Sequence, residues 1–117
     1  MAQTFRLYAD AINVGDYYTA YNLLTPSVRA TSGTVEEYGE KLSTSFWTAV
    51  EIVDVAAVDA TTDDVEVRFT TEQDAAAGAG GQTCSDWWVS YRMVLDAGFW
   101  QIDRARRLAE PSPCAGA

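Results

Sequence analysis

The chain has 117 residues, of which 48% are apolar, and a formal net charge of −9. This length suits one domain of ordinary size, and the apolar content supplies a core and excludes disorder. An acidic surface repels phosphate backbones, which argues against nucleic acid as a partner. The chain has no histidine, the commonest metal ligand and acid–base group, so we expect no metal and no cofactor.

The first 45 residues carry the 3.6-residue apolar period of amphipathic helices. Gly15 favours the left-handed conformation that closes a helix, and Thr34 with Glu37 has the spacing of a capping box that begins another. Thr25-Pro26 indicates one short additional turn. The pattern predicts three helices, over residues 5–14, 17–24 and 34–45.

After residue 46 the apolar period changes to 2, which is typical of strands. Ala97-Gly98 separates two alternating segments closely enough for a tight hairpin. The predicted strands cover residues 47–58, 65–70, 83–96 and 99–108. We therefore predict an α+β fold in which three N-terminal helices pack on a four-stranded, mainly antiparallel sheet.

Two segments, YADAINVGDYYTAY at residues 8–21 and GFWQID at residues 98–103, occur within this order of helices and strands. Together they resemble the nuclear transport factor 2-like superfamily, over residues 4–108. The resemblance implies that the sheet curves around the first helix as a cone, often with an apolar pocket inside. Within the superfamily the chain is most similar to extracytoplasmic domains of actinobacterial lipoproteins, membrane proteins and serine/threonine kinases.

Cys84 opens the third predicted strand and Cys114 follows the fourth. The spacing of the two cysteines and the absence of histidine argue against a metal site, which leaves a disulfide or two separate thiols. Antiparallel pairing and the resemblance, whose members have cysteines at such places, both favour the disulfide. A disulfide implies an oxidising compartment, so we expect a secreted or membrane-anchored domain with any tether outside this sequence. The predicted division is a nuclear transport factor 2-like domain over residues 1–110 and a tail, 111–117, tied back by the bridge.

The resemblance also implies side chains that face the pocket, with core packing as the alternative for the tyrosines. The ligand-binding candidates are Tyr8, Tyr18, Tyr21, Tyr38, Trp47 and Arg92. A catalytic cone needs a carboxylate in an apolar cavity, and the candidates Asp54 and Asp103 fit a solvated or arginine-paired surface role better. We therefore assign no catalytic residue.

Two further features bear on partners. Adjacent strand residues face opposite ways, so Trp87 or Trp88 lies on the outer face of the sheet, as a homodimer contact or under the tail. Arg104, Arg106 and Arg107 form a basic cluster that either pairs with neighbouring acids or meets an anion.

The first functional hypothesis is a non-catalytic extracytoplasmic binding, sensing or interaction domain, with a small apolar molecule as the expected ligand. The alternative is a small isomerase, cyclase or dehydratase that uses a pocket aspartate with tyrosine. A third hypothesis is a structural subunit that acts only through the face of its sheet.

Overall fold

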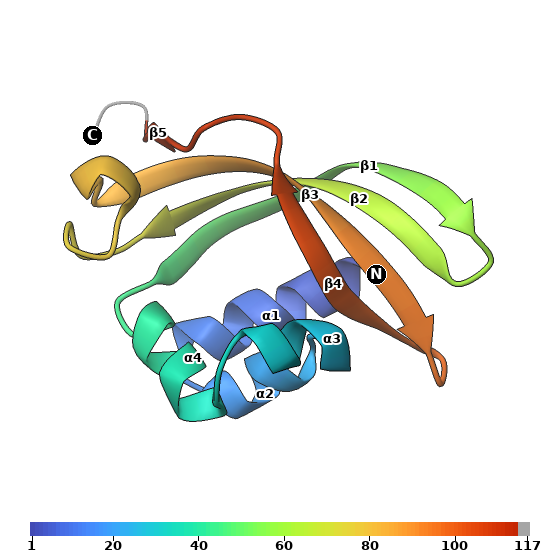
Figure 1. Cartoon of the computed structure of the whole chain (residues 1–117). Coiled ribbons are helices and arrows are strands. Elements are labelled where there is room, and N and C mark those ends of the chain that lie inside the picture. Colours follow the sequence, from blue (N-terminus) through green and yellow to red (C-terminus); the bar gives the residue numbers. More distant parts are fainter. Residues whose placement is uncertain (115–117) are drawn as a thin grey trace.

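The computed structural model describes residues 1–114, in which four helices lie under an arched antiparallel sheet (Figure 1). The predicted α+β class is confirmed, and the turn expected after Thr25-Pro26 is long enough to form a short helix of its own. The elements are α1 (Ala2–Asn13), α2 (Tyr17–Asn22), α3 (Pro26–Thr31), α4 (Val35–Leu42), β1 (Phe46–Asp59), β2 (Thr62–Glu72), the 3₁₀ helix η1 (Ala79–Gly81), β3 (Cys84–Asp96), β4 (Phe99–Arg107) and β5 (Ser112–Pro113).

Capping side chains set the helix boundaries. Gly15, with φ of 76°, follows the end of α1, and the Asp16 carboxylate accepts the Thr19 N–H at 3.2 Å to begin α2. At α4 the predicted capping box is present: the Glu37 N–H donates to Thr34 Oγ1, and the Thr34 N–H donates to Glu37 Oε1. Because these two N–H groups are hydrogen-bonded by side chains, α4 can be short without leaving them unpaired at its start.

Asn13 fixes the end of α1 against the start of β1. Its side-chain nitrogen donates to the Trp47 carbonyl at 2.8 Å, and its side-chain oxygen accepts the Trp47 N–H at 2.7 Å. Because β1 is an edge strand, these backbone groups would otherwise face the unpaired edge of the sheet. The amide thus replaces a neighbouring strand and holds the Trp47 ring over the helices.

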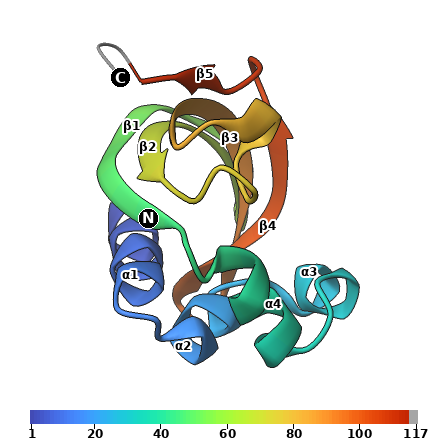
Figure 2. The same ribbon diagram turned by 90° about the vertical axis from the view of Figure 1, so that its left-hand side faces the viewer.

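The sheet has the strand order β1-β2-β3-β4, all antiparallel, with β5 added beside β3. Register shifts interrupt the pairing three times along β1 and once between β3 and β4. Such bulges increase twist and bend a sheet, which fits the curl in Figure 2. The outer edge of β4 is covered, because the N–H of Ile102 donates to Leu23 and its carbonyl accepts from Thr25.

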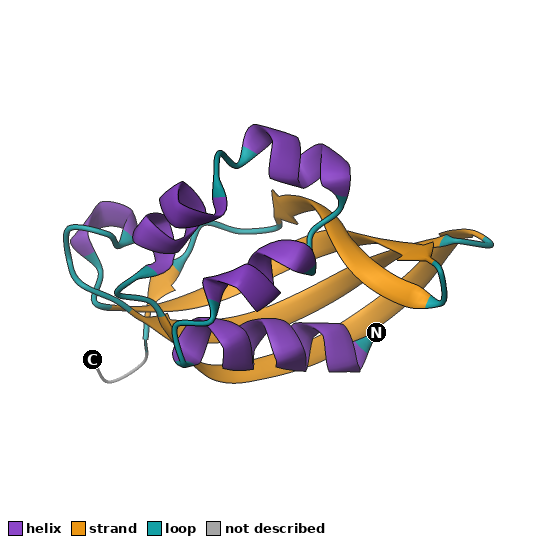
Figure 3. Cartoon of the chain, turned by 90° about the horizontal axis from the view of Figure 1, so that it is seen from below, coloured by secondary structure: helices purple, strands orange, loops and turns teal. Residues whose placement is uncertain are grey.

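The core lies between the concave face of the sheet and the helices. Figure 3 shows from below how the helices lie against the sheet. Alternate residues of β2 and β3 supply the sheet side, and α1 supplies the helix side. Burying each such side chain contributes roughly 1.5–3 kcal/mol. The largest fully buried apolar side chains are Phe5, Ile12, Val65, Val67 and Met93.

The predicted disulfide joins Cys84 to Cys114 with a Cα–Cα distance of 5.4 Å. The Cys114 N–H also donates to the Cys84 carbonyl at 3.2 Å, and β5 pairs with the start of β3 through Ser85 and Asp86. The tail is therefore tied back as far as residue 114, whereas residues 115–117 lie outside the described part. The division between a domain ending at residue 110 and a tail stays a prediction. Within residues 1–114, no helix has the length and apolarity that crossing a membrane requires.

Candidate functional site

A cavity of about 330 Å³ lies between the concave face of the sheet and the helices. This volume is in the range of small-molecule sites, roughly 300–1,000 Å³. Its wall is mainly aromatic and aliphatic, and no Asp or Glu is among the described residues that line it. The side chains that form most of the apolar wall are Tyr8, Trp47, Phe69, Trp87, Val89 and Tyr91.

Three stacked rings form one side of the cavity. Trp47 on β1 and Phe69 on β2 lie parallel, with ring centroids 4.1 Å apart and planes inclined by 4°. Phe69 is paired in register with Trp87 on β3, whose ring centroid is 5.8 Å away. Tyr8 meets the edge of Trp47 at 5.7 Å. Because the rings stack face to face, with Phe69 between Trp47 and Trp87, the stack turns apolar ring edges toward the cavity.

Tyrosine hydroxyls are the main polar groups inside the cone. The hydroxyls of Tyr8 on α1 and Tyr38 on α4 are hydrogen-bonded to each other. Burial raises the pKa of Tyr8 well above its ordinary value, and the Tyr38 hydroxyl raises it further. Burial likewise raises the pKa of Tyr38 and, more strongly, that of Tyr91. All three phenols are therefore neutral at physiological pH and can act as donors.

Tyr91 differs from the other two because its hydroxyl has no hydrogen-bond partner within residues 1–114. No buried side-chain polar atom in this part of the chain lacks a partner, so the Tyr91 oxygen reaches accessible space. Tyr91 lines the cavity, which makes this hydroxyl available to a bound molecule.

A chain of hydrogen bonds organises the β2–β3 end of the cavity. Trp87 Nε1 donates to Thr71 Oγ1 at 2.9 Å, and Thr71 Oγ1 donates to Gln73 Oε1 at 2.7 Å. Gln73 Nε2 then donates to the Gln82 carbonyl across the loop at 2.9 Å. A Cβ at Gly78 would lie 1.9 Å from that carbonyl oxygen, so only glycine allows this loop to close. The bonds fix both the loop and the Trp87 ring.

Of the predicted ligand-binding residues, the structure brings Tyr8, Tyr38 and Trp47 together. Tyr8 and Trp47 line the cavity, and Tyr38 contacts it through Tyr8. Tyr21 lies behind them, with its ring 5.6 Å from that of Tyr38. The Tyr21 hydroxyl donates to the Gly33 carbonyl at 2.7 Å, so it joins helices and does not face the cavity.

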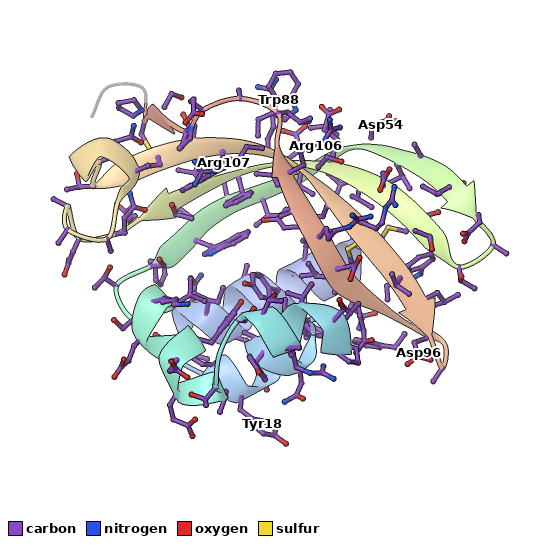
Figure 4. All side chains as sticks on the ribbon, in the orientation of Figure 1. Tyr18, Asp54, Trp88, Asp96, Arg106 and Arg107 are labelled. Atoms are coloured by element: carbon purple, nitrogen blue, oxygen red, sulfur yellow. A yellow bond between two sulfur atoms is a disulfide. The ribbon has the colours of Figure 1, made fainter. Side chains whose placement is uncertain are left out.

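Tyr18 and Arg92 do not lie near the cavity, which corrects the sequence-based placement. Tyr18 is 72% exposed and points away from the sheet on α2 (Figure 4). Arg92 lies on the outer face, because β3 alternates and Tyr91 and Met93 occupy the inner face. There its Nε and Nη2 donate to the two oxygens of Asp64 at 2.9 and 3.1 Å.

The two carboxylates weighed as possible bases are also outside the cavity. Asp54 is exposed on β1, and Figure 4 places it on the side of the sheet away from the helices. Asp103 is half-buried, accepts from Thr25 Oγ1 at 2.7 Å and lies 3.7 Å from Arg104 Nε. Within residues 1–114, no group of histidine, cysteine, aspartate and glutamate side chains is arranged to hold a metal ion.

The adjacent tryptophans face opposite ways, as predicted. Trp87 is inside, and Trp88 lies on the outer face (Figure 4). Trp88 is half-buried there: its Nε1 donates to Glu66 at 2.8 Å, and the Arg68 guanidinium lies 4.4 Å from the ring centroid. Ser112 of the tail borders the same outer hollow. The outer tryptophan is thus partly covered from within the chain.

Sequence reasoning missed several polar residues of the cavity, among them Tyr91, Arg107 and Gln73. Arg107 was grouped with Arg104 and Arg106, but it lines the cavity with its guanidinium carbon 5.2 Å from the Trp87 ring centroid. Strand alternation would have separated Arg107 from Arg106, although the bulge in β4 obscures which face each takes. Gln73 gave no signal, because an isolated glutamine after a strand fits many loops.

Comparisons with known proteins support the fold. No family model matches the chain, and no curated protein matches it. A SEC-C motif-containing protein from Rhodopseudomonas palustris superposes with a TM-score of 0.66 and 11% identity, over 86% of this chain and 72% of that one. A ketosteroid isomerase-like protein from Erwinia carotovora atroseptica has a TM-score of 0.58 and 18% identity, over 92% and 93%.

At these identities the likenesses show the fold alone, a curved antiparallel sheet packed on helices. The fold that the predicted resemblance implies is therefore supported. The finer likeness to extracytoplasmic domains of actinobacterial proteins stays a prediction.

Proposed function

We propose that this chain is a non-catalytic, extracytoplasmic binding or sensing domain whose cone holds a small apolar molecule. The observation that carries the proposal is the aromatic cavity of about 330 Å³ with the partnerless Tyr91 hydroxyl on its wall. The apolar body of a ligand would contact the stacked rings of Trp47, Phe69 and Trp87 at their edges. One acceptor oxygen, such as a carbonyl, would receive the Tyr91 hydrogen bond.

Binding is favoured over the isomerase, cyclase or dehydratase alternative by the charges around the cavity. Those reactions need a carboxylate or histidine that moves a proton inside the apolar space. The chain has no histidine, and the described wall contributes Arg107 as its charged group and no carboxylate. Neutral phenols with raised pKa values are poor bases near pH 7 but good donors.

The extracytoplasmic part of the proposal is supported by the disulfide. A bridge between Cys84 and Cys114 persists in an oxidising compartment and is rare in the cytosol. The bridge has a structural role, because it ties the tail to β3 and lies apart from the cavity wall. A homodimer through the outer face of the sheet is a further possibility that sedimentation velocity at increasing concentration would test.

The binding test uses anilinonaphthalene sulfonate as a fluorescent probe and two competitors of similar shape. We expect one probe molecule per chain, and we expect acetylnaphthalene to displace it at a concentration roughly fivefold below ethylnaphthalene, the value of one net hydrogen bond. Tyr91→Phe should abolish this preference because it removes the donor and keeps the ring.

Ala105→Phe fills the cavity from its exposed rim and should abolish probe binding. Ala57→Phe places the same side chain on exposed β1, away from the cavity, and should leave binding intact. Equal binding by both variants would overturn the assignment of the site. Turnover of a bound ketone that is lost in Asp103→Asn would overturn the non-catalytic role.

A further inference from the structure

A second cleft, of about 320 Å³, lies on the outer face of the sheet, on the opposite side from the apolar cavity. Strands β2, β3 and β4 build it, and their register brings its side chains together: Asp64 is paired with Arg92, and Ser90 with Arg106. The β4 bulge adds Arg104 to the same face. The lining residues are Asp64, Ser90, Arg92, Arg104, Ala105 and Arg106.

The cleft is positive although the chain is acidic. The net charge is −9 with eight lysine and arginine residues in all, and three of these arginines line this one cleft. Three guanidinium groups against one carboxylate, Asp64, give the lining a formal charge of +2. Arg106, opposite Ser90, lies diagonally from Arg92 and two residues from Arg104, so the three like charges repel one another on this face. A bound anion would relieve the repulsion.

The guanidinium groups are engaged to different degrees. Arg92 is fully committed, with its bidentate pair to Asp64 at 2.9 and 3.1 Å. Arg104 has only a 3.7 Å contact with Asp103 and its side chain is 74% exposed. Arg106 forms no ion pair in the described part of the chain. Two arginines therefore have donors available at the cleft.

Two neighbouring carboxylates, Glu66 and Asp103, do not line the cleft. Glu66 accepts from the Trp88 ring nitrogen at 2.8 Å, and Asp103 accepts from Thr25 at 2.7 Å. The pKa of the Asp64 carboxyl is lowered, first by its hydrogen bond from Arg92 and then by the charges of Arg92, Arg106 and Arg104. The charges of all three arginines thus lower the pKa of the same carboxyl, that of Asp64.

We propose that this outer cleft binds a doubly charged oxyanion, a phosphate or sulfate group, held by Arg104 and Arg106 with Ser90 beside them. The planar fork of arginine matches two oxygens of such a group, which gives it strength and direction. Asp64 sits at the cleft as an internal competitor, because it occupies Arg92 and repels the incoming anion. The site is separate from the apolar cavity and does not depend on it.

The test follows the Arg Nε–Hε signals by NMR while inorganic phosphate, then sulfate, is added at low ionic strength. The signals of Arg104 and Arg106 should shift saturably with one anion per chain, and that of Arg6 should not move. Arg106→Gln should weaken binding about tenfold, the worth of one charge-assisted pair of hydrogen bonds. Arg6→Gln makes the same change of net charge on exposed α1 and should leave affinity unchanged.

Asp64→Asn should change phosphate affinity in the opposite direction, and misfolding would not produce such a gain in affinity. It removes the competing carboxylate and should tighten phosphate binding several-fold. Equal affinity in Arg106→Gln and Arg6→Gln, unchanged affinity in Asp64→Asn, or shifts that grow linearly with phosphate would each overturn the proposal. Vesicles that contain phosphatidic acid distinguish the source of the phosphate group. If the protein co-sediments with these vesicles and Arg106→Gln does not, the group is a lipid headgroup. If the protein binds phosphate but does not co-sediment with the vesicles, the ligand is soluble.

Discussion

Tyr8, Tyr38 and Tyr91 reach the inside of the cone from α1, α4 and β3. Burial is the largest cause of the raised pKa of each phenol, because a phenolate loses its hydration there. The folded protein thus holds these protons more tightly than the unfolded chain, whose tyrosines titrate near about pH 10. Their contribution to stability is fully present below that pH and is lost as pH rises through the folded-state values.

An alkaline titration followed at 295 nm should therefore contain a late component of three of the six tyrosines. This component should ionise together with the loss of the far-ultraviolet circular dichroism signal, since unfolding exposes the phenols. Tyr91→Phe should reduce it to two tyrosines. Ionisation of all six near pH 10 while the circular dichroism is still native would contradict the placement of these hydroxyls.

The residues of the cavity were only partly accessible to prediction. Tyr8 and Trp47 follow from helix and strand periodicity, which states which face a side chain takes. Periodicity places Tyr17 and Tyr21 on the apolar face of their helix and leaves Tyr18 off it, so the placement of Tyr18 near a pocket came from the resemblance and not from the pattern. Arg92 was misplaced although strand alternation already sets it opposite Tyr91 and Met93; only its pairing with Asp64 depends on strand register, which a single sequence does not specify.

At the scale of elements, the β3–β4 hairpin contains a local conflict between sequence and geometry. Its two-residue turn places Ala97 at φ 51° and Gly98 at φ 78°. Positive φ at both positions is the geometry of a type I′ turn, which suits asparagine followed by glycine. Ala97 is the only non-glycine residue with positive φ in residues 1–114, and its Cβ disfavours that region by about 1 kcal/mol.

Ala97→Asn should therefore raise the free energy of unfolding by about 0.5–1 kcal/mol, because asparagine tolerates the left-handed region better. The measurement is the urea unfolding midpoint at constant slope. Ala60→Asn is the matched control, since Ala60 lies in the β1–β2 turn without positive φ and should give no gain. An equal effect at both turns would show that the backbone conformation is not the cause.

The helices and strands were predicted well where the period of the apolar residues was clear. The strands over 47–58, 65–70, 83–96 and 99–108 agree with β1 to β4 within a few residues, because each alternates and is bounded by turn residues. The bulges were not predictable, since one extra residue in a strand leaves composition unchanged. The bulge in β4 decides which arginines reach the outer cleft, so that site was predictable only as a basic cluster.

At the scale of the whole molecule, the disulfide should contribute substantially to stability. It closes a loop across 30 positions, which on the chain-entropy model corresponds to about 3–4 kcal/mol. The double variant Cys84→Ser, Cys114→Ser should lose about this much in urea unfolding followed by tryptophan fluorescence. Reductant should bring the parent protein to the same stability and leave the variant unchanged. A loss below about 1 kcal/mol would contradict the model for this loop.

The same bridge has a consequence for how the molecule survives cutting. The β3–β4 hairpin, with its exposed Ala97-Gly98 tip, lies wholly between Cys84 and Cys114. A protease that cleaves the tip would leave two polypeptides joined by sulfur and by the surrounding strands. The nicked product would keep its size and its aromatic interior, and the pieces would part only when the bridge is reduced and the strands are denatured.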